Sequence, residues 1–501
     1  MKRLNITSPR DIWLIQLVLG LMPMLLLFML VINTTHNHFT YTLDDPYIHL
    51  ALARNIAHGH YGININEASA PSSSILWPFL LAPFATFNLF EYTPLIINSL
   101  CLWALIYCLN KLFLEKAFFL RLLLIGTVLL SINAYGLVFT GMEHNLQILL
   151  VGIIVQTVAS LKNDADKDIK PVVPTAVFIA IVLLPLIRYE GLAIALPVLA
   201  YLFCRGDRKR AIIALLVLMV SVVGFSGYLY SLNLGLLPSS VLLKSSHGNL
   251  DSIVDNVIKN LDKYGFLLLP VALLSTYYWR KDFALALVIF SATLLHFILG
   301  KFGWFGRYEA YWLLFIFIFC YQNLKNKIDE SAMSLITLLI IPFAFASMVF
   351  CTLKTPLAAS NIYNQQVQTA KIAQMLAEPI AVQDLGVVAL RSNQYVLDLV
   401  GLGSLEVLKL RQASSGFAWM ETLMKRKAVK YAFIYDSDIR EKPATWIKVA
   451  EMQIINQDVL TPAYDTVAFY AVDSQSTTKL RDVMSKFSSI EKSINFSVKI
   501  Y

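Results

Sequence analysis

Two adjacent acidic residues, Asp44 and Asp45, follow the first long apolar segment of the chain, residues 12–32. A charged side chain at membrane depth costs roughly 2.5–3.5 kcal/mol on insertion scales, so such residues are expected to serve a function. A carboxylate in this position can act as a general base toward a hydroxyl group. Helix capping is the alternative, because Asp is favoured at N-caps and Pro46 is typical of a first turn. Asp44 is the preferred base, since Asp45 directly precedes Pro46 and is better placed as the cap.

Three basic residues, Arg188, Lys244 and Arg307, are expected near the outer ends of apolar segments, against the bias that places Lys and Arg in cytoplasmic loops. Arg binds phosphate by bidentate hydrogen bonds, and Lys binds it as a point charge. The three residues therefore predict a site for an anionic ligand. The alternatives are a solvated loop position for Lys244, a pair with Glu190 or lipid headgroups for Arg188, and headgroup contact for Arg307.

Five further residues in the expected outer loops are candidates to line the same cavity. They are His49, Arg54, Glu143, Ser240 and Trp304. A helix start for Glu143, a structural role for His49 and an interfacial position for Trp304 are the alternatives. The sequence has no CxxC or HExxH pattern, so it predicts no dedicated metal site, although a divalent cation remains compatible with the acidic pair. It also has no Walker A loop, so no nucleotide site is evident.

The composition is typical of a polytopic membrane protein, with 57% hydrophobic and 15% charged residues in 501. The net charge of +8 comes largely from basic loops and does not call for nucleic acid. Eleven spans are expected. They are residues 12–32, 93–112, 117–139, 142–161, 171–187, 190–204, 211–232, 265–279, 283–300, 310–324 and 332–353.

The basic loops between these spans place the N-terminus in the cytoplasm and the C-terminus outside a bacterial inner membrane. Residues 75–90 are apolar but short and contain two prolines. Counting them as a span would invert every later loop, so an interfacial or re-entrant helix is expected there. Residues 1–354 are then a membrane domain whose outer loop, residues 33–92, holds juxtamembrane helices. Residues 355–501 regain charges and β-rich runs and are expected to form a periplasmic α/β domain.

Five different short motifs follow one another along the outer loops. They are Asp44-Asp45-Pro46-Tyr47-Ile48, Thr140-Gly141-Met142-Glu143, Arg188-Tyr189-Glu190-Gly191, Pro238-Ser239-Ser240 with Lys244, and Gly303-Trp304 with Arg307-Tyr308. This order resembles the polyprenyl-phosphate-sugar-dependent glycosyltransferases of the GT-C superfamily, in particular the mycobacterial arabinofuranosyltransferase type. The resemblance covers the whole membrane part and implies a mainly α, GT-C-like bundle. Pro46 and Ser239-Ser240 depart from the family pattern, which affects the identity of sugar and acceptor.

The resemblance implies transfer of one sugar from a polyprenyl-phosphate carrier to an envelope glycan, glycolipid or protein acceptor, with inversion. Asp44 or Asp45 would be the base, and Lys244, Arg188 and Arg307 would bind the donor phosphate. Glu143, His49, Arg54, Trp304 and Ser240 would contact sugar or acceptor. The partners would be the lipid donor, the acceptor and membrane lipids. A transporter or flippase of a lipid-linked sugar is the alternative, and a ligand sensor is a weaker one.

Overall fold

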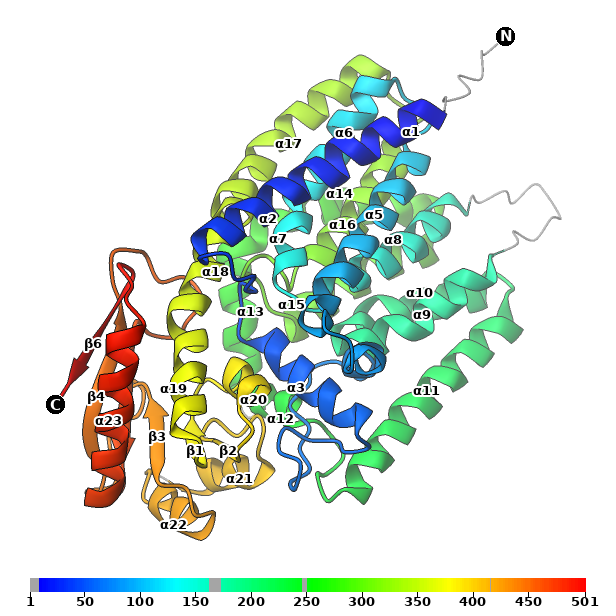
Figure 1. The fold of residues 1–501 in the computed structure, drawn as a ribbon. Coiled ribbons are helices and arrows are strands. Elements are labelled where there is room, and N and C mark those ends of the chain that lie inside the picture. The colour runs from blue at the N-terminus through cyan, green and yellow to red at the C-terminus, as the bar shows by residue number, and fades with distance from the viewer. Residues whose placement is uncertain (1–8, 162–172, 246–249, 415) are drawn as a thin grey trace.

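The computed structural model of the chain describes residues 9–161, 173–245, 250–414 and 416–501. Within these residues the protein is mainly helical, with one mixed sheet near the C-terminus (Figure 1). The N-terminal helix lies at the far end of the helical bundle from the sheet. The sheet and its helices therefore form a separate layer at one end of the bundle.

Apolar runs without charge form the bundle helices, as expected for segments that bury or expose apolar surface all round. The helices before the C-terminal region are α1 (Pro9–Gln16), α2 (Met22–Thr34), α3 (Asp45–Ala57), α4 (Trp77–Leu81), α5 (Thr93–Leu112), α6 (Phe118–Ser131), α7 (Ala134–Phe139), α8 (His144–Ser160), α9 (Thr175–Ile187), α10 (Leu192–Cys204), α11 (Arg208–Ser231), α12 (Ser239–Ser245), α13 (Leu250–Tyr264), α14 (Leu268–Lys281), α15 (Phe283–Leu299), α16 (Ala310–Leu324) and α17 (Glu330–Phe350).

Four helical segments among the described residues are long and apolar enough to cross a membrane: Pro9–Thr34, Phe90–Leu112, Arg208–Ser231 and Glu330–Leu376. Shorter apolar helices occupy most of the other expected spans, so the count of about eleven is not confirmed. Residues 75–90 form the short helix α4 and a 3₁₀ turn, Ala82–Phe84, and a second 3₁₀ turn, Phe90–Tyr92, begins at the last of them. At about 1.5 Å per residue, α4 is far too short to span about 30 Å of hydrocarbon.

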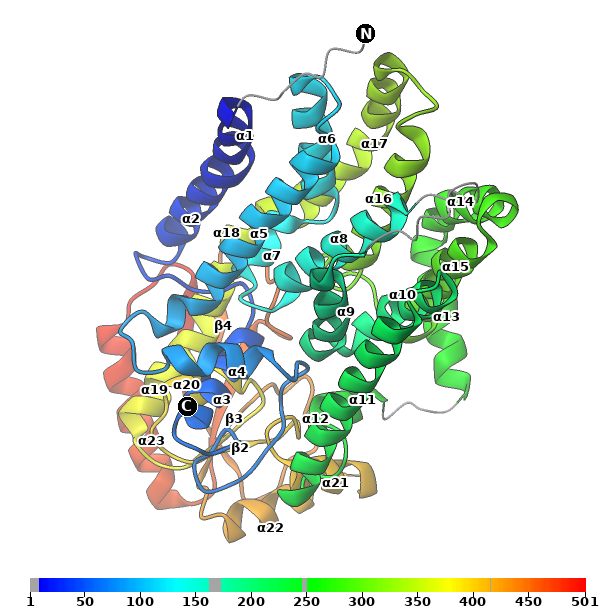
Figure 2. The same cartoon turned by 90° about the vertical axis from the view of Figure 1, so that its right-hand side faces the viewer.

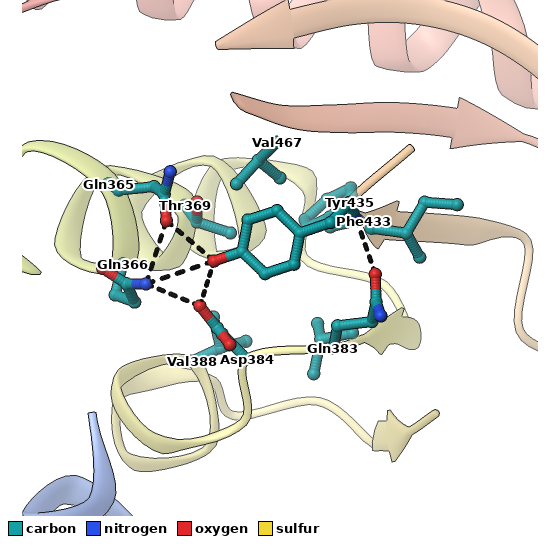
Figure 3. A pocket seen from close by; sticks show the side chains of 11 residues that line it. Gln365, Gln366, Thr369, Gln383, Asp384, Val388, Phe433, Tyr435 and Val467 are labelled. Carbon is teal, nitrogen blue, oxygen red and sulfur yellow. Dashed lines mark hydrogen bonds between the residues drawn. The ribbon is translucent and has the colours of Figure 1, made fainter. Parts of the chain in front are cut away.

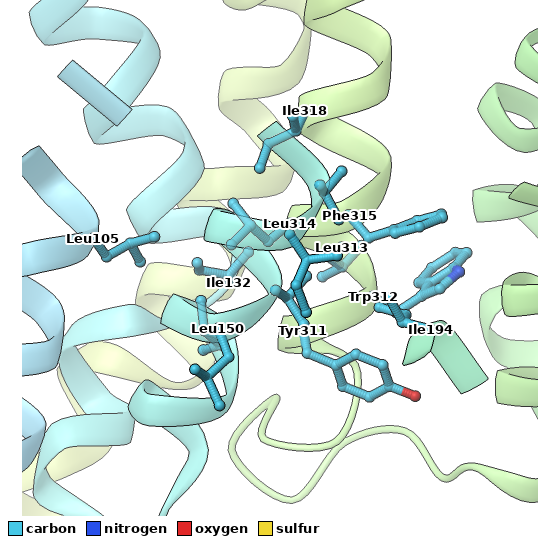
Figure 4. Close-up of a cluster of buried hydrophobic side chains, with 14 of the residues drawn as sticks. Leu105, Ile132, Leu150, Ile194, Tyr311, Trp312, Leu313, Leu314, Phe315 and Ile318 are labelled. Carbon is cyan, nitrogen blue, oxygen red and sulfur yellow. The ribbon is translucent and has the colours of Figure 1, made fainter. Parts of the chain in front are cut away.

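The bundle is held by large buried side chains around α16. Trp312, Leu314 and Phe315 of this helix are fully or almost fully buried, and they pack with Leu105 of α5 and Ile194 of α10 (Figure 4). Burying a large apolar side chain stabilises a fold by about 1.5–3 kcal/mol. This core fixes the ends of the bundle helices, from which the polar loops project.

The C-terminal region continues directly from the bundle through a helical stretch. Its helices are α18 (Thr355–Ile362), α19 (Gln368–Leu376), α20 (Gly386–Arg391), α21 (Leu405–Ala413), α22 (Trp419–Arg426) and α23 (Ser474–Ile490). Its strands are β1 (Ile380–Val382), β2 (Val396–Asp398), β3 (Tyr431–Ile434), β4 (Ile447–Ile454), β5 (Thr466–Ala471) and β6 (Phe496–Ile500). A mainly helical chain with a C-terminal α/β sheet region was the expected fold class, and at this level it is confirmed.

The sheet has the order β2-β1-β3-β5-β4-β6. Strand β1 runs parallel to β2 on one side and to β3 on the other, whereas β5, β4 and β6 are antiparallel to their neighbours. The next two strands in the sequence, β2 and β3, therefore add to opposite sides of β1. In open sheets a crevice forms outside the carboxyl ends of parallel strands at such a point.

Helix α20, which follows β1, lies beside α3 of the first outer loop (Figures 1 and 2). Asp44, at the start of α3, accepts hydrogen bonds from the backbone N–H groups of Gly386 and Val387 at 2.5 and 2.9 Å. Arg54, near the end of α3, donates to the carbonyls of Leu390 and Ala389 at 2.6 and 3.3 Å. The two helices are thus held together at both ends.

Candidate active site

Asp44 is half-buried between the first outer loop and the crevice beside β1, where it borders a cavity. Burial is the main cause that raises the pKa of its carboxyl to about 8, and the nearby Asp384 raises it further. The two backbone N–H groups of α20 act in the opposite direction. Because both of its oxygens already accept hydrogen bonds, Asp44 is a structural link to the C-terminal region in this conformation. The prediction that Asp44 is the base is therefore not favoured by its position.

Asp45 borders the same cavity but has a different partner. Its Oδ2 accepts a hydrogen bond from Nη1 of Arg307 at 2.9 Å, and its side chain is 43% exposed. Helix α3 begins at Asp45, and Asp44 occupies the N-cap position, so the prediction that Asp45 caps this helix is wrong. An accessible carboxylate is the better general base, because an acceptor hydroxyl can approach within hydrogen-bond distance.

Arg307 is buried, and its guanidinium is only partly occupied. Its Nη2 donates to the Tyr308 hydroxyl at 3.0 Å, and its Nε has no hydrogen-bond partner among the described residues. Its pKa is raised: burial acts to lower it, but the attraction of Asp45 and Tyr308 outweighs this, so the group stays charged. A buried donor without a partner costs about 1–3 kcal/mol, which an incoming anionic oxygen would recover.

Arg188 contacts two carboxylates. Its Nη1 donates to Glu143 at 2.7 Å and its Nη2 donates to Glu190 at 2.8 Å. Arg188 and Glu143 are both buried, and the Arg188 guanidinium lies 5.8 Å from the centre of the Tyr308 ring. The phosphate-binding role of Arg188 remains a prediction, but here its guanidinium holds three outer loops together.

Gly141 brings the second outer loop against the first. It has a φ of +66°, and a Cβ at this position would lie 2.7 Å from side-chain atoms of both Pro46 and Tyr41. The backbone N–H of Thr42 also donates to the carbonyl of Phe139 at 3.0 Å. A left-handed conformation without a side chain is therefore needed at Gly141 for the second outer loop to approach the first this closely.

His49 connects the first loop to the fourth. Ser72 Oγ lies 3.2 Å from His49 Nδ1, and Ser240 donates to the Ser72 carbonyl at 2.8 Å. Burial lowers the pKa of His49, so its imidazole is neutral at physiological pH. Lys244 lies in α12 with Ser240, but its side chain is outside the described residues.

Trp304 belongs to a tight loop between α15 and α16. Four consecutive residues, Gly303, Trp304, Phe305 and Gly306, have φ between 51° and 85°. Positive φ at bulky residues is strained and persists only where the surroundings enforce it. Here Asn133 donates to the Phe305 carbonyl at 2.7 Å, and Glu309 accepts from the Gly303 N–H at 2.9 Å.

A cavity of about 240 Å³ lies beside this loop. It is bordered by Asp44 and Asp45, by the 52% exposed Trp304, and by Gln366 and Asp384 of the C-terminal region. A cavity of this size accommodates about one sugar ring, and its lining combines one aromatic face with several polar groups. This is the point where the expected base and a sugar-sized space coincide.

Asp384 is a site residue that the sequence argument did not select. It lies two residues after the end of β1, and its Oδ2 accepts hydrogen bonds from the Tyr435 hydroxyl and, at 2.5 Å, from Gln366 Nε2 (Figure 3). Burial raises its pKa, whereas Tyr435 and Gln366 lower it. A carboxylate at the end of a buried strand was the signal that could have identified it.

The structure brings together Asp45, His49, Glu143, Arg188, Arg307 and Trp304, and it places Arg54 at the other end of α3. Among the described residues, no group of three or more His, Cys, Asp or Glu side chains is arranged to hold a metal ion. Asp44 already accepts backbone hydrogen bonds and Asp45 pairs with Arg307, so the acidic pair as arranged here does not fit a divalent cation.

Comparisons with known proteins give two findings. A family described as a domain of unknown function, DUF8728, matches residues 360–470, within the C-terminal sheet region. The chain is also similar to the crystal structure of the Archaeoglobus fulgidus oligosaccharyltransferase in complex with Zn and sulfate. That similarity has 12% sequence identity and a TM-score of 0.45 and covers 90% of this chain and 72% of that chain. No curated protein matches the chain.

Proposed function

We propose that the protein is a membrane glycosyltransferase that moves one sugar from a polyprenyl-phosphate carrier to an acceptor outside the cytoplasmic membrane. The observation that carries the proposal is the Asp45–Arg307 pair at the border of a sugar-sized cavity. It combines an accessible base with a buried cation for a phosphate leaving group. The ordered motifs that resemble GT-C enzymes, including Arg307-Tyr308, lie around the same pair.

The donor phosphate binds Arg307 through its unpartnered Nε and an Nη group, and Asp45 is thereby released. Asp45 then takes the proton of an acceptor hydroxyl. The hydroxyl oxygen forms a bond to the anomeric carbon, and the bond from that carbon to the phosphate oxygen breaks. Polyprenyl phosphate leaves with the electron pair, neutralised by Arg307 and Lys244. Direct displacement inverts the anomeric centre.

The other residues position these groups. Glu143 has one carboxylate oxygen without a hydrogen-bond partner among the described residues, and it orients a sugar hydroxyl. His49 and Ser240 hold the first and fourth loops together through Ser72. Trp304 covers one face of the sugar.

The arrangement of charges supports a topology with the N-terminus in the cytoplasm. Asp11 pairs with Arg121 at 3.3 Å, and Lys116 donates to the carbonyl of Lys325 at 3.3 Å. Two of the basic segments expected in the cytoplasm, near residues 116–121 and 325, thus lie together, and the first of them contacts the N-terminal helix at the end of the bundle away from the sheet (Figure 1). A reporter fused after Arg208 should report cytoplasm, and one fused after Asn361 should report the periplasm. The reverse signals would contradict this orientation.

Mass spectrometry of envelope lipids and glycans tests the proposed reaction. Cells that lack the gene should accumulate a polyprenyl-phosphate sugar and lack one sugar on an envelope glycan, glycolipid or protein. Restoring the gene should reverse both changes. Identical polyprenyl-phosphate sugars and glycans in the two strains would overturn the proposal.

A further inference from the structure

A second, larger cavity forms a groove between the first outer loop and the C-terminal region. It has a volume of about 560 Å³, within the range of ligand sites. Its lining includes His58, Asn64 and Asn66 on the side of the outer loop, and Asn393 and Gln394 on the side of β2. It is separate from the cavity beside Asp45, with which it shares no lining residue among those described.

The walls of this groove are fixed by hydrogen bonds between its two sides. The Asn64 side chain donates to the Val396 carbonyl and accepts from the Val396 N–H, both at 2.9 Å. It therefore pairs with the edge of β2 as a neighbouring strand would. Tyr395 donates to Glu67 at 2.6 Å, and Arg54 holds the end of α20. The groove is thus a formed feature of the folded chain.

The chemistry of the lining favours a neutral polyhydroxyl ligand. Side-chain amides offer both donors and acceptors, as sugar hydroxyls require. His58 Nδ1 lies 2.7 Å from the Arg54 carbonyl, so it donates there and leaves Nε2 as an acceptor in the neutral ring. Ile65, 65% exposed, adds an apolar surface. The described lining has no carboxylate and no lysine, and Arg54 directs its two Nη groups to carbonyls.

The groove and the catalytic cavity lie at opposite ends of one helix. Arg54 borders the groove, and Asp45 borders the cavity, nine positions earlier in α3. At 1.5 Å per residue this separation is about 14 Å along the helix axis, a distance that a few linked sugar rings span. An acceptor that occupies both sites must therefore span at least this distance.

We propose that this groove binds a neutral oligosaccharide segment of the acceptor, away from the sugar that receives the transfer. The groove itself predicts only a neutral glycan. That this glycan is the acceptor rests on the proposed function. The acceptor class is then a glycan or glycolipid, in preference to a peptide.

Binding to the purified full-length protein in nanodiscs tests this groove. The neutral probes are maltohexaose, chitohexaose and arabinohexaose, and the acidic probe is hexagalacturonate, each followed by saturation-transfer NMR and titration. At least one neutral probe should bind more tightly than hexagalacturonate. The Asn393→Ala/Gln394→Ala variant should weaken that binding about fivefold or more, through loss of two or more neutral hydrogen bonds. Asn66→Ala provides a second, independent variant of the opposite wall.

The matched control is Gln475→Ala, an exposed amide on α23, which should bind the neutral probe as wild type does. Failure of every neutral probe, tighter binding of hexagalacturonate, or unchanged binding by folded variants of both walls would overturn the inference. Binding measured here needs no donor. If the lipid analysis shows no transferase phenotype while a neutral probe binds the groove, the proposed function fails and the groove remains.

Discussion

Asp45 and Arg307 stand 262 positions apart in the sequence, and their side chains form an ion pair of 2.9 Å where two outer loops meet. The ion pair is a poor source of fold stability, because Asp45 is part-exposed and Arg307 retains a buried donor without a partner among the described residues. Under the proposed function, this pair is a resting state in which Asp45 neutralises Arg307 until the donor arrives.

Replacing Arg307 should weaken donor binding. Arg307→Lys keeps the charge but removes the planar fork, and a charge-assisted hydrogen bond contributes roughly 1.5–3 kcal/mol, or about 10- to 150-fold in binding. Titration with the polyprenyl-phosphate sugar that accumulates in cells lacking the gene measures this effect. Lys301→Ala, an exposed cation in the same loop, is the control. Wild-type affinity in folded Arg307→Lys would remove this residue from the phosphate site.

Replacing Arg188 should affect folding first. Arg188→Met leaves the buried Glu143 carboxylate without its cation, and breaking a buried pair costs roughly 3–5 kcal/mol. The Arg188→Met/Glu143→Gln double variant removes that charge and should regain part of the lost thermal stability. Thermal unfolding in detergent measures both. A single variant as stable as wild type would show that Arg188 is dispensable for the loops and would favour the phosphate role.

The carboxyl pair Asp44 and Asp384 should make stability depend on pH. The pKa of Asp44 is raised from 3.8 to about 8, and that of Asp384 is raised as well, so the folded state retains protons that the unfolded state loses. This stabilisation is complete below about pH 3.8 and is lost as the pH rises through about 8. Asp384→Asn should flatten the fall in Tm between these values.

Thermal unfolding at several pH values compares wild type, Asp384→Asn and the exposed control Asp465→Asn. The control should follow the wild-type curve, because Asp465 lies on the surface. An Asp384→Asn curve parallel to wild type would show that Asp384 does not contribute to the pH dependence of stability.

Gly386 should be required for the contact between α3 and α20. A Cβ at this position would lie 2.0 Å from the backbone oxygen of Asp44, so Gly386→Ala must push the two helices apart. We expect faster hydrogen exchange in residues 380–398 and easier proteolysis there. Gly227→Ala in α11, where nothing lies within 4 Å of the added Cβ, is the matched control. Equal hydrogen exchange in the two variants would show that Gly386 is not required for the contact between α3 and α20.

The elements of the fold could be predicted largely from hydropathy. Uncharged runs predicted the bundle helices, and three β-rich runs that begin near residues 380, 429 and 464 contain β1, β3 and β5. Strand β4 was not predicted, because it mixes charged and apolar residues. The number of spans could not be derived from these patterns, since several apolar helices are too short to cross a bilayer by themselves.

The site was predicted in its residue types more than in its pairings. The alternation of loops gathered Asp45, Glu143, Arg188 and Arg307 on one side, but which carboxylate meets which cation depends on loop conformations such as the positive φ run at Gly303–Gly306. The cap was assigned to Asp45, whereas Asp44 occupies the N-cap position and is held by Gly386 and Val387, more than 340 positions away. Capping preferences act locally and carry no information about such a contact.

The transfer rate of Asp45→Asn is the most direct test that Asp45 is the general base. The substitution removes the charge of the proposed base with almost no change in shape, and loss of a general base typically costs about 100- to 10,000-fold in rate. The measurement is single-turnover transfer from the accumulated lipid donor by purified Asp45→Asn, with donor affinity measured in parallel. If Asp45 is the base, transfer should be at least about 100-fold slower with donor binding retained, and Asp44→Asn should have a smaller effect. Transfer by folded Asp45→Asn at the wild-type rate would contradict this role.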